Sequence, residues 1–474
     1  MRQTQTSVVW FRTDLRMSDN PCLHAAIKRG LIIPVFIYSP EEEGDWPLGG
    51  ASKWWLHQSL KSLAASLEKL GAKLIIRRGE AVKELESLVQ ETGASALFWN
   101  LRYEPFAIEQ ECKVEKYFQK IGIETQSFNG GLLFEPWKIA NKSGKPFRVF
   151  TPFWKTCLAS AGKIPKPLSA PKKIESPKHF PKSLAPNELE LEPKLDWAKE
   201  FSKVWEPGEA GAQKNLKRFL RDVISDYENS RNRPDQQGTS RLSPHLHFGE
   251  ISPRQIWATV QKNKSVSAKK YLAEIGWREF AYHLLFHFPK TPTKPLHEKF
   301  DAFPWRKNAA WLNAWQHGQT GFPIVDAGMR ELWATGWMHN RVRMIVGSFL
   351  VKDLLLPWQS GARWFWDTLV DADLANNTLG WQWVAGCGAD ASPFFRIFNP
   401  MMQGEKFDPN GNYVRKWIPE LAKLPDKWIH QPWNAPEEIL SKAGIKLGKT
   451  YPQPIVSHAI AREVALEAFQ KIKS

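Results

Sequence analysis

The sequence predicts an α/β N-terminal domain, built on a Rossmann-like parallel sheet of five strands, followed by an all-α domain. Three observations lead to this fold class. Short apolar runs alternate with helical patterns in residues 1–140, a stretch rich in proline and lysine follows, and strand signals fade beyond Val204. A chain of 474 residues with 42% hydrophobic side chains is long enough for two or three domains with a sizeable core.

Four apolar runs in the N-terminal domain are typical of buried strands: residues 8–11, 32–38, 74–76 and 96–99. Amphipathic helices lie between them. The clearest helix ends at Gly71, a typical C-terminal cap, and carries leucines at intervals of three and four residues: Leu56, Leu60, Leu63, Leu67 and Leu70. No glycine-rich phosphate loop follows a strand, so we expect any ligand of this domain to be held differently from a dinucleotide.

The composition changes at residues 162–193, which are rich in proline and lysine and typical of an extended connector. We therefore predict an N-terminal domain at residues 1–140, a linker at 141–203 and a helical domain at 204–474. Helical patterns dominate the last part, for example in residues 215–227 and 330–356.

The net charge of +16, from 65 basic and 49 acidic residues, favours a polyanionic partner, with nucleic acid the leading candidate. A membrane surface, or a charge that only aids solubility, are the alternatives. The 24 tryptophans favour nucleic acid, since indoles stack on bases. Four scattered cysteines are typical of reduced thiols, and the chain has neither a long apolar run nor a signal peptide. We therefore expect a cytoplasmic protein that does not cross a membrane.

Residues 369–400 interleave carboxylates, amides and indoles more densely than ordinary core sequence. Hydrogen-bonding edges beside stacking faces suit a flavin or a nucleobase. The side chains concerned are Asp371, Asp373, Asn376, Asn377, Trp381 and Trp383. A capping turn followed by an aromatic core helix is the alternative interpretation.

Three further segments carry candidate site residues. Residues 238–255 open with hydroxyl side chains that suit a phosphate, although an ordinary helix start is the alternative. His245 and His247 follow, but no third metal ligand clusters near them, so packing or hydrogen bonding is expected. Residues 271–283 and 336–344 add acids, indoles and guanidinium groups at helical spacing, which alone would indicate surface ion pairs.

Six motifs, taken together and in this order, resemble the photolyase/cryptochrome family: WFRTDLRMSDNP, GTSRLSPHLHFGEISPR, WREF, TGWMHNRVRM, DADLANNTLGWQW and RIFNPMMQGEKFDP. The resemblance covers almost the whole chain. It implies an antenna domain and a helical domain that holds a U-shaped FAD. It also implies light-driven repair of cyclobutane pyrimidine dimers in UV-damaged DNA, by electron transfer from excited reduced FAD to a flipped-out dimer.

Carried over to this sequence, the resemblance implies three sets of residues. The FAD pocket would comprise Tyr227, Thr239, Ser240, Arg241, Leu242, Ser243, Glu274, Arg278, Asn340, Arg343, Asp371, Asp373 and Asn377, with Arg343 paired to Asp371. The DNA side would comprise Arg231, Glu274, Trp277, Asn340, Arg341, Met344 and Trp383. The catalytic set would be Glu274, Asn340 and Asn377, with an electron wire that runs from Trp381 at the flavin through Trp358 to Trp305 at the surface. No metal is implied.

Asn377 falls where family members differ near flavin N5, and a neutral amide that can reorient there indicates the repair enzyme. A cryptochrome-like blue-light photoreceptor is the first alternative. A DNA-binding flavoprotein without repair activity is the second, although that class would be expected to lose Glu274, Asn340 or Met344, which are all present. No long signalling tail is expected, because the chain ends at Ser474.

Two positions depart from the best-known bacterial photolyases. Tyr271 replaces a tryptophan, a small change that keeps an aromatic wall, and NLRYEPFAIEQE lacks the adjacent Asn-Glu pair that binds folate there, which leaves the antenna chromophore open. GGASKWWLHQSL and SPHLHFGE are closer to plant cryptochromes and to class III photolyases. The resemblance favours methenyltetrahydrofolate in another pose, with a deazaflavin or FMN as alternatives, and a monomeric protein.

Overall fold

The computed structural model describes residues 5–193, 196–391 and 395–473. The N-terminal domain contains a sheet of β1 (Gln5–Phe11), β2 (Gly30–Tyr38), β3 (Ile75–Arg78), β4 (Ala96–Asn100) and β5 (Glu124–Phe128). All pairs are parallel, and the strand order is β3-β2-β1-β4-β5. The predicted five-stranded parallel sheet is confirmed.

Helices cover both faces of this sheet because the side chains of its central strands alternate between two cores. Val9 and Phe11 of β1 belong to a core shared with α1 (Pro21–Ile27) and α2 (Gly50–Lys69). Val8 and Trp10 belong to a second core, shared with α3 (Ala81–Thr92) and α4 (Pro105–Lys120). The predicted leucine helix is α2, and the glycine that follows its end adopts a left-handed φ of 91°.

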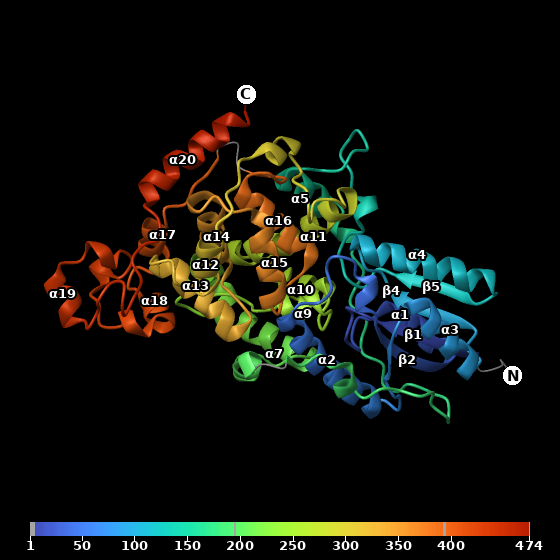
Figure 1. The fold of residues 1–474 in the computed structure, drawn as a ribbon. Helices are drawn as coiled ribbons and strands as arrows, with labels where there is room; N and C mark the ends of the chain where they lie inside the picture. The colour runs from blue at the N-terminus through green and yellow to red at the C-terminus, as the bar shows by residue number, and fades with distance from the viewer. Residues whose placement is uncertain (1–4, 194–195, 392–394, 474) are drawn as a thin grey trace.

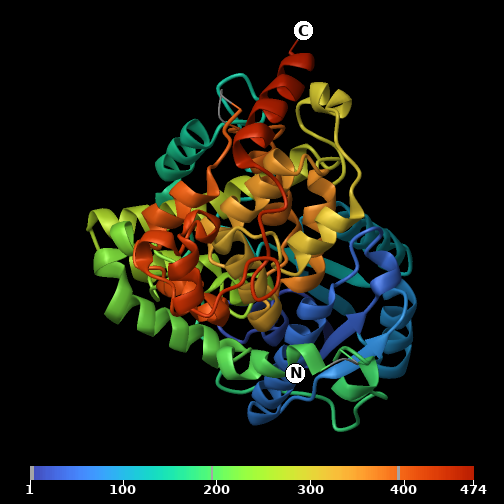
Figure 2. The ribbon, with the colours of Figure 1, turned by 60° about the vertical axis from the view of Figure 1, so that its left-hand side comes forward.

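The second domain is helical, as predicted: beyond Val204 the described residues form helices, turns and one isolated bridge. Its helices are α7 (Glu209–Arg218), α8 (Tyr227–Ser230), α9 (Ser243–His247), α10 (Pro253–Val260), α11 (Val266–His287), α12 (Ala309–Gln316), α13 (Pro323–Thr335), α14 (Asn340–Ser348), α15 (Trp358–Thr368), α16 (Leu374–Ala385), α17 (Pro400–Phe407), α18 (Asn412–Trp417), α19 (Glu437–Lys442) and α20 (His458–Lys471). Figures 1 and 2 show this domain, green to red, beside the blue sheet domain, with α20 projecting at the C-terminus.

The segment predicted as a linker, residues 141–203, is not uniformly extended. It contains α5 (Phe150–Ala159) and, at its end, α6 (Phe201–Val204). Phe153 and Cys157 of α5 are buried in a core that they share with α11, and α5 lies beside α11 in Figure 1. Within the predicted linker, α5 therefore packs its apolar face against the helical domain.

Arg16 joins the two domains. Its side chain is buried, and it donates to the carbonyl oxygens of Asp19 (2.7 Å) and Gly130 (2.7 Å) in the N-terminal segment and of Gly249 (2.8 Å) in the helical domain. Gly249 has a φ of 65°, and a Cβ there would lie 2.0 Å from the Thr13 carbonyl oxygen. The backbones of the two domains therefore meet at a position that requires glycine.

None of the helices in the described ranges is both long and apolar enough to span a membrane.

Candidate active site

A cavity of about 550 Å³ opens in the helical domain between α11, α14, α16 and the turn at residues 239–243. Its walls contain every residue that the resemblance assigns to the FAD pocket or to the DNA side. Of all the predicted site residues, only Trp305 and Trp358 do not line it. Segments separated by more than a hundred residues in the sequence thus meet around one space.

Helix α11 contributes five of the lining residues, and Glu274, Trp277 and Arg278 among them share one face of the helix. Glu274 forms an ion pair with Arg231 (2.7 Å). Burial raises the pKa of Glu274, and the positive charge of Arg231 opposes that rise. A carboxylate and a guanidinium therefore lie paired in the cavity wall.

Arg278 also lines the cavity, but its guanidinium already has protein partners. It donates to the Gly131 carbonyl oxygen (2.9 Å) and lies over the Tyr282 ring, 4.8 Å from the ring centre. Tyr282 stands four residues after Arg278 on α11, a spacing that could have identified it from the sequence.

The turn at residues 239–243, which carries the hydroxyl side chains, is stabilised by contacts with two tryptophans. Arg241 has a φ of 55°, and its guanidinium lies over the indoles of both Trp205 (4.4 Å) and Trp337 (4.8 Å), which contact each other edge to face. The Trp337 indole N–H donates to the Ser243 hydroxyl (3.3 Å). Trp337 lines the cavity and was not predicted, although it lies within the motif TGWMHNRVRM.

Helix α14 places Arg343 and Arg341 in the wall. Arg343 donates to both carboxylate oxygens of Asp371 (2.8 and 3.0 Å), so the predicted ion pair is present. Arg341 donates to the side-chain oxygen of Asn232 (2.8 Å). Asn340, the first residue of α14, is exposed at the rim.

Asp373 caps α16, the helix that places Asn376, Asn377, Trp381 and Trp383 in the cavity wall. Its carboxylate accepts the Asn376 backbone N–H (2.8 Å) and the hydroxyl hydrogen of Tyr282, and it lies 3.8 Å from His247. Burial alone would raise the pKa of Asp373, but His247, Arg278 and Tyr282 hold it well below its usual range. This carboxylate is therefore ionised and fixed in orientation.

The Asn377 amide group is partly fixed as well, because it donates to the Ala362 carbonyl oxygen (3.0 Å). The sequence interpretation treated this amide as free to reorient. The contact with α15 restricts that freedom while leaving the side chain in the cavity wall. A long-range contact of this kind has no signature in the local sequence.

The three indoles of the predicted wire belong to one hydrophobic cluster. Trp381 is 3% exposed, lines the cavity and packs so closely on Gly361 that a Cβ there would lie 2.1 Å from its ring. Trp358 is 1% exposed and does not line the cavity, and Trp305 is only partly buried. Their burial thus runs from the cavity wall through the core toward the surface.

The two histidines considered as metal ligands have other partners. His245 contacts Glu250 and the side-chain nitrogen of Asn215 (3.2 Å), and His247 contacts Asp373. Within the described parts of the chain, no group of three side chains could hold a metal ion.

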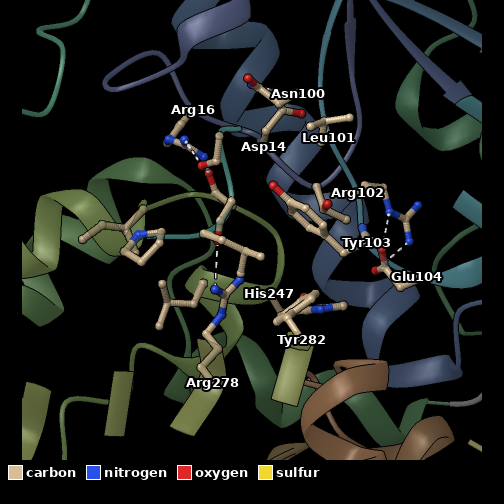
Figure 3. A pocket seen from close by; sticks show the side chains of 18 residues that line it. Asp14, Arg16, Asn100, Leu101, Arg102, Tyr103, Glu104, His247, Arg278 and Tyr282 are labelled. Atoms are coloured by element: carbon tan, nitrogen blue, oxygen red, sulfur yellow. Dashed lines mark hydrogen bonds and ion pairs between the residues drawn. The ribbon is translucent and has the colours of Figure 1, made fainter. Parts of the chain in front are cut away.

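The carboxyl ends of β1 and β4 form the switch point of the sheet, where doubly wound proteins commonly bind ligands. A crevice of about 20 Å³, roughly the space of one water molecule, lies there, and Figure 3 shows the side chains that line it. Asn100 fills part of it and donates to Asp14 (2.6 Å) and to Asn20 (2.8 Å). His247 and Arg278 line both this crevice and the large cavity, so the wall between them is one side-chain layer thick.

Comparison with known proteins agrees with this architecture. Residues 7–172 match a family model described as DNA photolyase, and residues 271–471 match one described as the FAD binding domain of DNA photolyase. The chain is 50% identical to the deoxyribodipyrimidine photo-lyase of Agrobacterium fabrum, covering 99% of each chain. It is 42% identical to Cryptochrome-1 of Arabidopsis thaliana, covering 98% of this chain and 70% of that one.

Among solved structures, a bacterial class III photolyase from Agrobacterium tumefaciens matches with a TM-score of 0.96 at 50% identity, over 99% of this chain and 98% of that one. The identity, the coverage and the shared domain order lead to one conclusion. The chain belongs to the photolyase/cryptochrome family.

Proposed function

We propose that this protein is a light-driven photolyase that repairs cyclobutane pyrimidine dimers in UV-damaged DNA with FAD as its cofactor. One observation carries the proposal. The residues that the family uses for flavin and those it uses for a flipped-out dimer line the same cavity of about 550 Å³. We further propose that the protein acts as a monomer in the cytoplasm, where it has access to DNA.

The cavity fits FAD in size and chemistry. Its volume lies within the roughly 300–1,000 Å³ typical of cofactor sites. The Thr239 and Ser240 hydroxyls would hold the phosphates, and the Arg343–Asp371 pair and Asp373 would hold the ring system through charged hydrogen bonds. When bound and reduced, FAD would supply the light-driven, reversible electron transfer that opens the cyclobutane ring.

The protein's own contribution is to bind and orient the lesion and to exclude water. Trp277 and Trp383 would stack against the flipped-out dimer, with Met344 packed beside them. Glu274 and Asn340 would hydrogen-bond its carbonyl and amide groups. Extrusion of the dimer costs a few kcal/mol, less than for intact bases, because damaged bases pair poorly.

Arg231 and Arg341 would bind the backbone phosphates, which makes affinity fall as salt rises. In the free protein both arginines are engaged, Arg231 by Glu274 and Arg341 by Asn232. DNA phosphates would therefore compete with these partners for the two guanidinium groups.

We propose methenyltetrahydrofolate as a second, antenna chromophore. The crevice at the switch point of the sheet measures only about 20 Å³, too little for a folate, a deazaflavin or FMN, so we propose that the chromophore binds elsewhere on the protein. Extraction of the pigments from purified protein, followed by their absorption spectra, distinguishes a folate from a second flavin.

The experiment that tests the proposed function is illumination of purified, reduced protein with a dimer-containing oligonucleotide while absorbance near 260 nm is followed. Light-dependent recovery of the thymine absorbance is expected, with none in the dark or with undamaged DNA. A flavin-loaded, reduced protein that gives no recovery would contradict dimer repair and favour a photoreceptor or another lesion.

Replacement of Glu274 by alanine should lower the repair yield by about three- to tenfold, because a buried hydrogen bond to the dimer is lost. The flavin content should stay unchanged. Glu274→Gln keeps hydrogen-bonding capacity without the charge and should retain more activity. Loss of flavin from Glu274→Ala would show that Glu274 serves the cofactor and not the substrate.

A further inference from the structure

Trp277 has only one face free for a ligand. The ring of Phe150 stacks on the other face, with ring centres 3.8 Å apart and planes within 9° of parallel. Trp277 lines the large cavity and Phe150 does not, so Phe150 lies behind the indole. The pair thus forms a double aromatic layer whose outer face is the cavity wall.

Phe150 is the first residue of α5, and α5 is clamped against α11. Gly276, next to Trp277, lies directly against the Trp154 ring: a Cβ at this position would be only 2.6 Å from the ring. Phe150 is itself nearly parallel to Trp154, with an angle of 14° and ring centres 6.3 Å apart. The rings of Trp154, Phe150 and Trp277 therefore form a row that ends at the cavity wall.

The start of α5 is also tied to the segment that follows α16. The Asp390 backbone N–H donates to the Arg148 carbonyl oxygen (3.0 Å), two residues before Phe150. Helix α16 carries Trp383, the second indole of the substrate side. The ring of Phe150 thus packs on one indole-bearing helix, and the backbone just before it is hydrogen-bonded to the segment after the other.

We infer that Phe150 is a positioning residue for substrate: its ring fixes the plane of the Trp277 indole at the orientation in which a flipped-out pyrimidine stacks on it. This inference rests on the proposed function. An indole without a backing ring can tilt, and stacking geometry weakens when rings leave the offset-parallel arrangement. Phe150 should therefore affect dimer affinity and leave general DNA binding intact.

The test compares the binding of dimer-containing and undamaged duplexes by flavin-loaded protein. Phe150→Leu should weaken dimer binding by about 2- to 10-fold, the usual range for one aromatic pair, without changing the affinity for undamaged DNA. Phe150→Tyr, which keeps the flat ring, should bind the dimer within about twofold of the unmodified protein. Should Phe150→Leu lose flavin, Phe150→Met is measured in the same way.

Phe153→Leu is the matched control. Phe153 is a buried aromatic on the same helix, but it packs on Phe280 and His283. The Phe153→Leu substitution should therefore leave dimer affinity unchanged.

A double substitution separates positioning from general loosening of α5. In a Trp277→Leu protein, Phe150→Leu should cause no further loss of dimer affinity. An equal loss in both backgrounds, a loss shared with undamaged DNA, or a loss in Phe153→Leu would overturn the role of Phe150. If the unmodified protein does not prefer the dimer at all, the proposed function itself fails, and the inference fails with it.

Discussion

Purified Trp381→Phe protein should keep its bound flavin oxidised under blue light with an external reductant, while chemically reduced protein still repairs dimers. We propose Trp381 as the electron donor next to the cofactor, and phenylalanine is far harder to oxidise than the indole it replaces, so the substitution removes the proposed donor. We expect photoreduction to slow by at least about tenfold, equivalent to a rise of about 1.4 kcal/mol in the effective barrier. The measurement is the loss of flavin absorbance near 450 nm during illumination.

Two controls make this result specific. Trp277 and Trp383 also line the cavity, so Trp277→Phe and Trp383→Phe test whether any neighbouring indole can serve. Both should photoreduce normally but bind the dimer less tightly. Unchanged photoreduction in Trp381→Phe would rule out Trp381 as the inner electron donor. Slow photoreduction in Trp383→Phe would assign the role of inner donor to Trp383.

Asp373→Ala protein should purify with almost no flavin. The substitution removes the cap of α16 and leaves the Tyr282 hydroxyl and the His247 ring without their buried anionic partner. Loss of one member of a buried charged network destabilises by about 3–5 kcal/mol, which far exceeds the loss of a surface contact. Flavin retention is measured as the ratio of absorbance at 450 nm to that at 280 nm, and folding by thermal melting.

Asp373→Asn keeps a capping oxygen and removes only the charge, so it should stay folded and hold flavin weakly. Asp326→Asn is the matched control, because Asp326 is also buried, accepts the Thr320 backbone N–H (2.7 Å) and the Tyr451 hydroxyl (2.7 Å), and lies outside the cavity. It should lower the melting temperature and leave the flavin ratio unchanged. Full flavin in folded Asp373→Ala protein would contradict our assignment of Asp373.

The central strands of the sheet were predictable because they are buried on both faces and consist of continuous apolar residues. Strand β5 was not recognised individually, since its sequence, ETQSF, belongs to a polar edge strand with three of its five residues exposed to solvent. Helix α5 was missed for a different reason. The proline- and lysine-rich residues around it dominated the local composition, and its partner surface on α11 lies more than a hundred residues away.

The cavity-lining residues were predictable where helical spacing places them on one face of a single helix, as with Glu274, Trp277 and Arg278 of α11. The contacts were not predictable where side chains from distant segments of the sequence meet. Nothing near Asp373 in the sequence indicates that Tyr282 and His247 will hold its charge. The same is true of Phe150, whose importance depends on the face of Trp277 that it covers.

The hydrogen bonds of Arg16 across the domain boundary affect whether the N-terminal domain can be exchanged between related proteins. The hydrogen bonds of the buried Arg16 guanidinium reach carbonyl oxygens of both domains and form together only when both domains are present, and the glycine at 249 lets their backbones approach. The N-terminal domain is therefore not interchangeable between family members as an independent unit. Transplanting it onto the helical domain of a relative requires the loop around residue 249 to come from the same parent, since the donor and its acceptors form one unit.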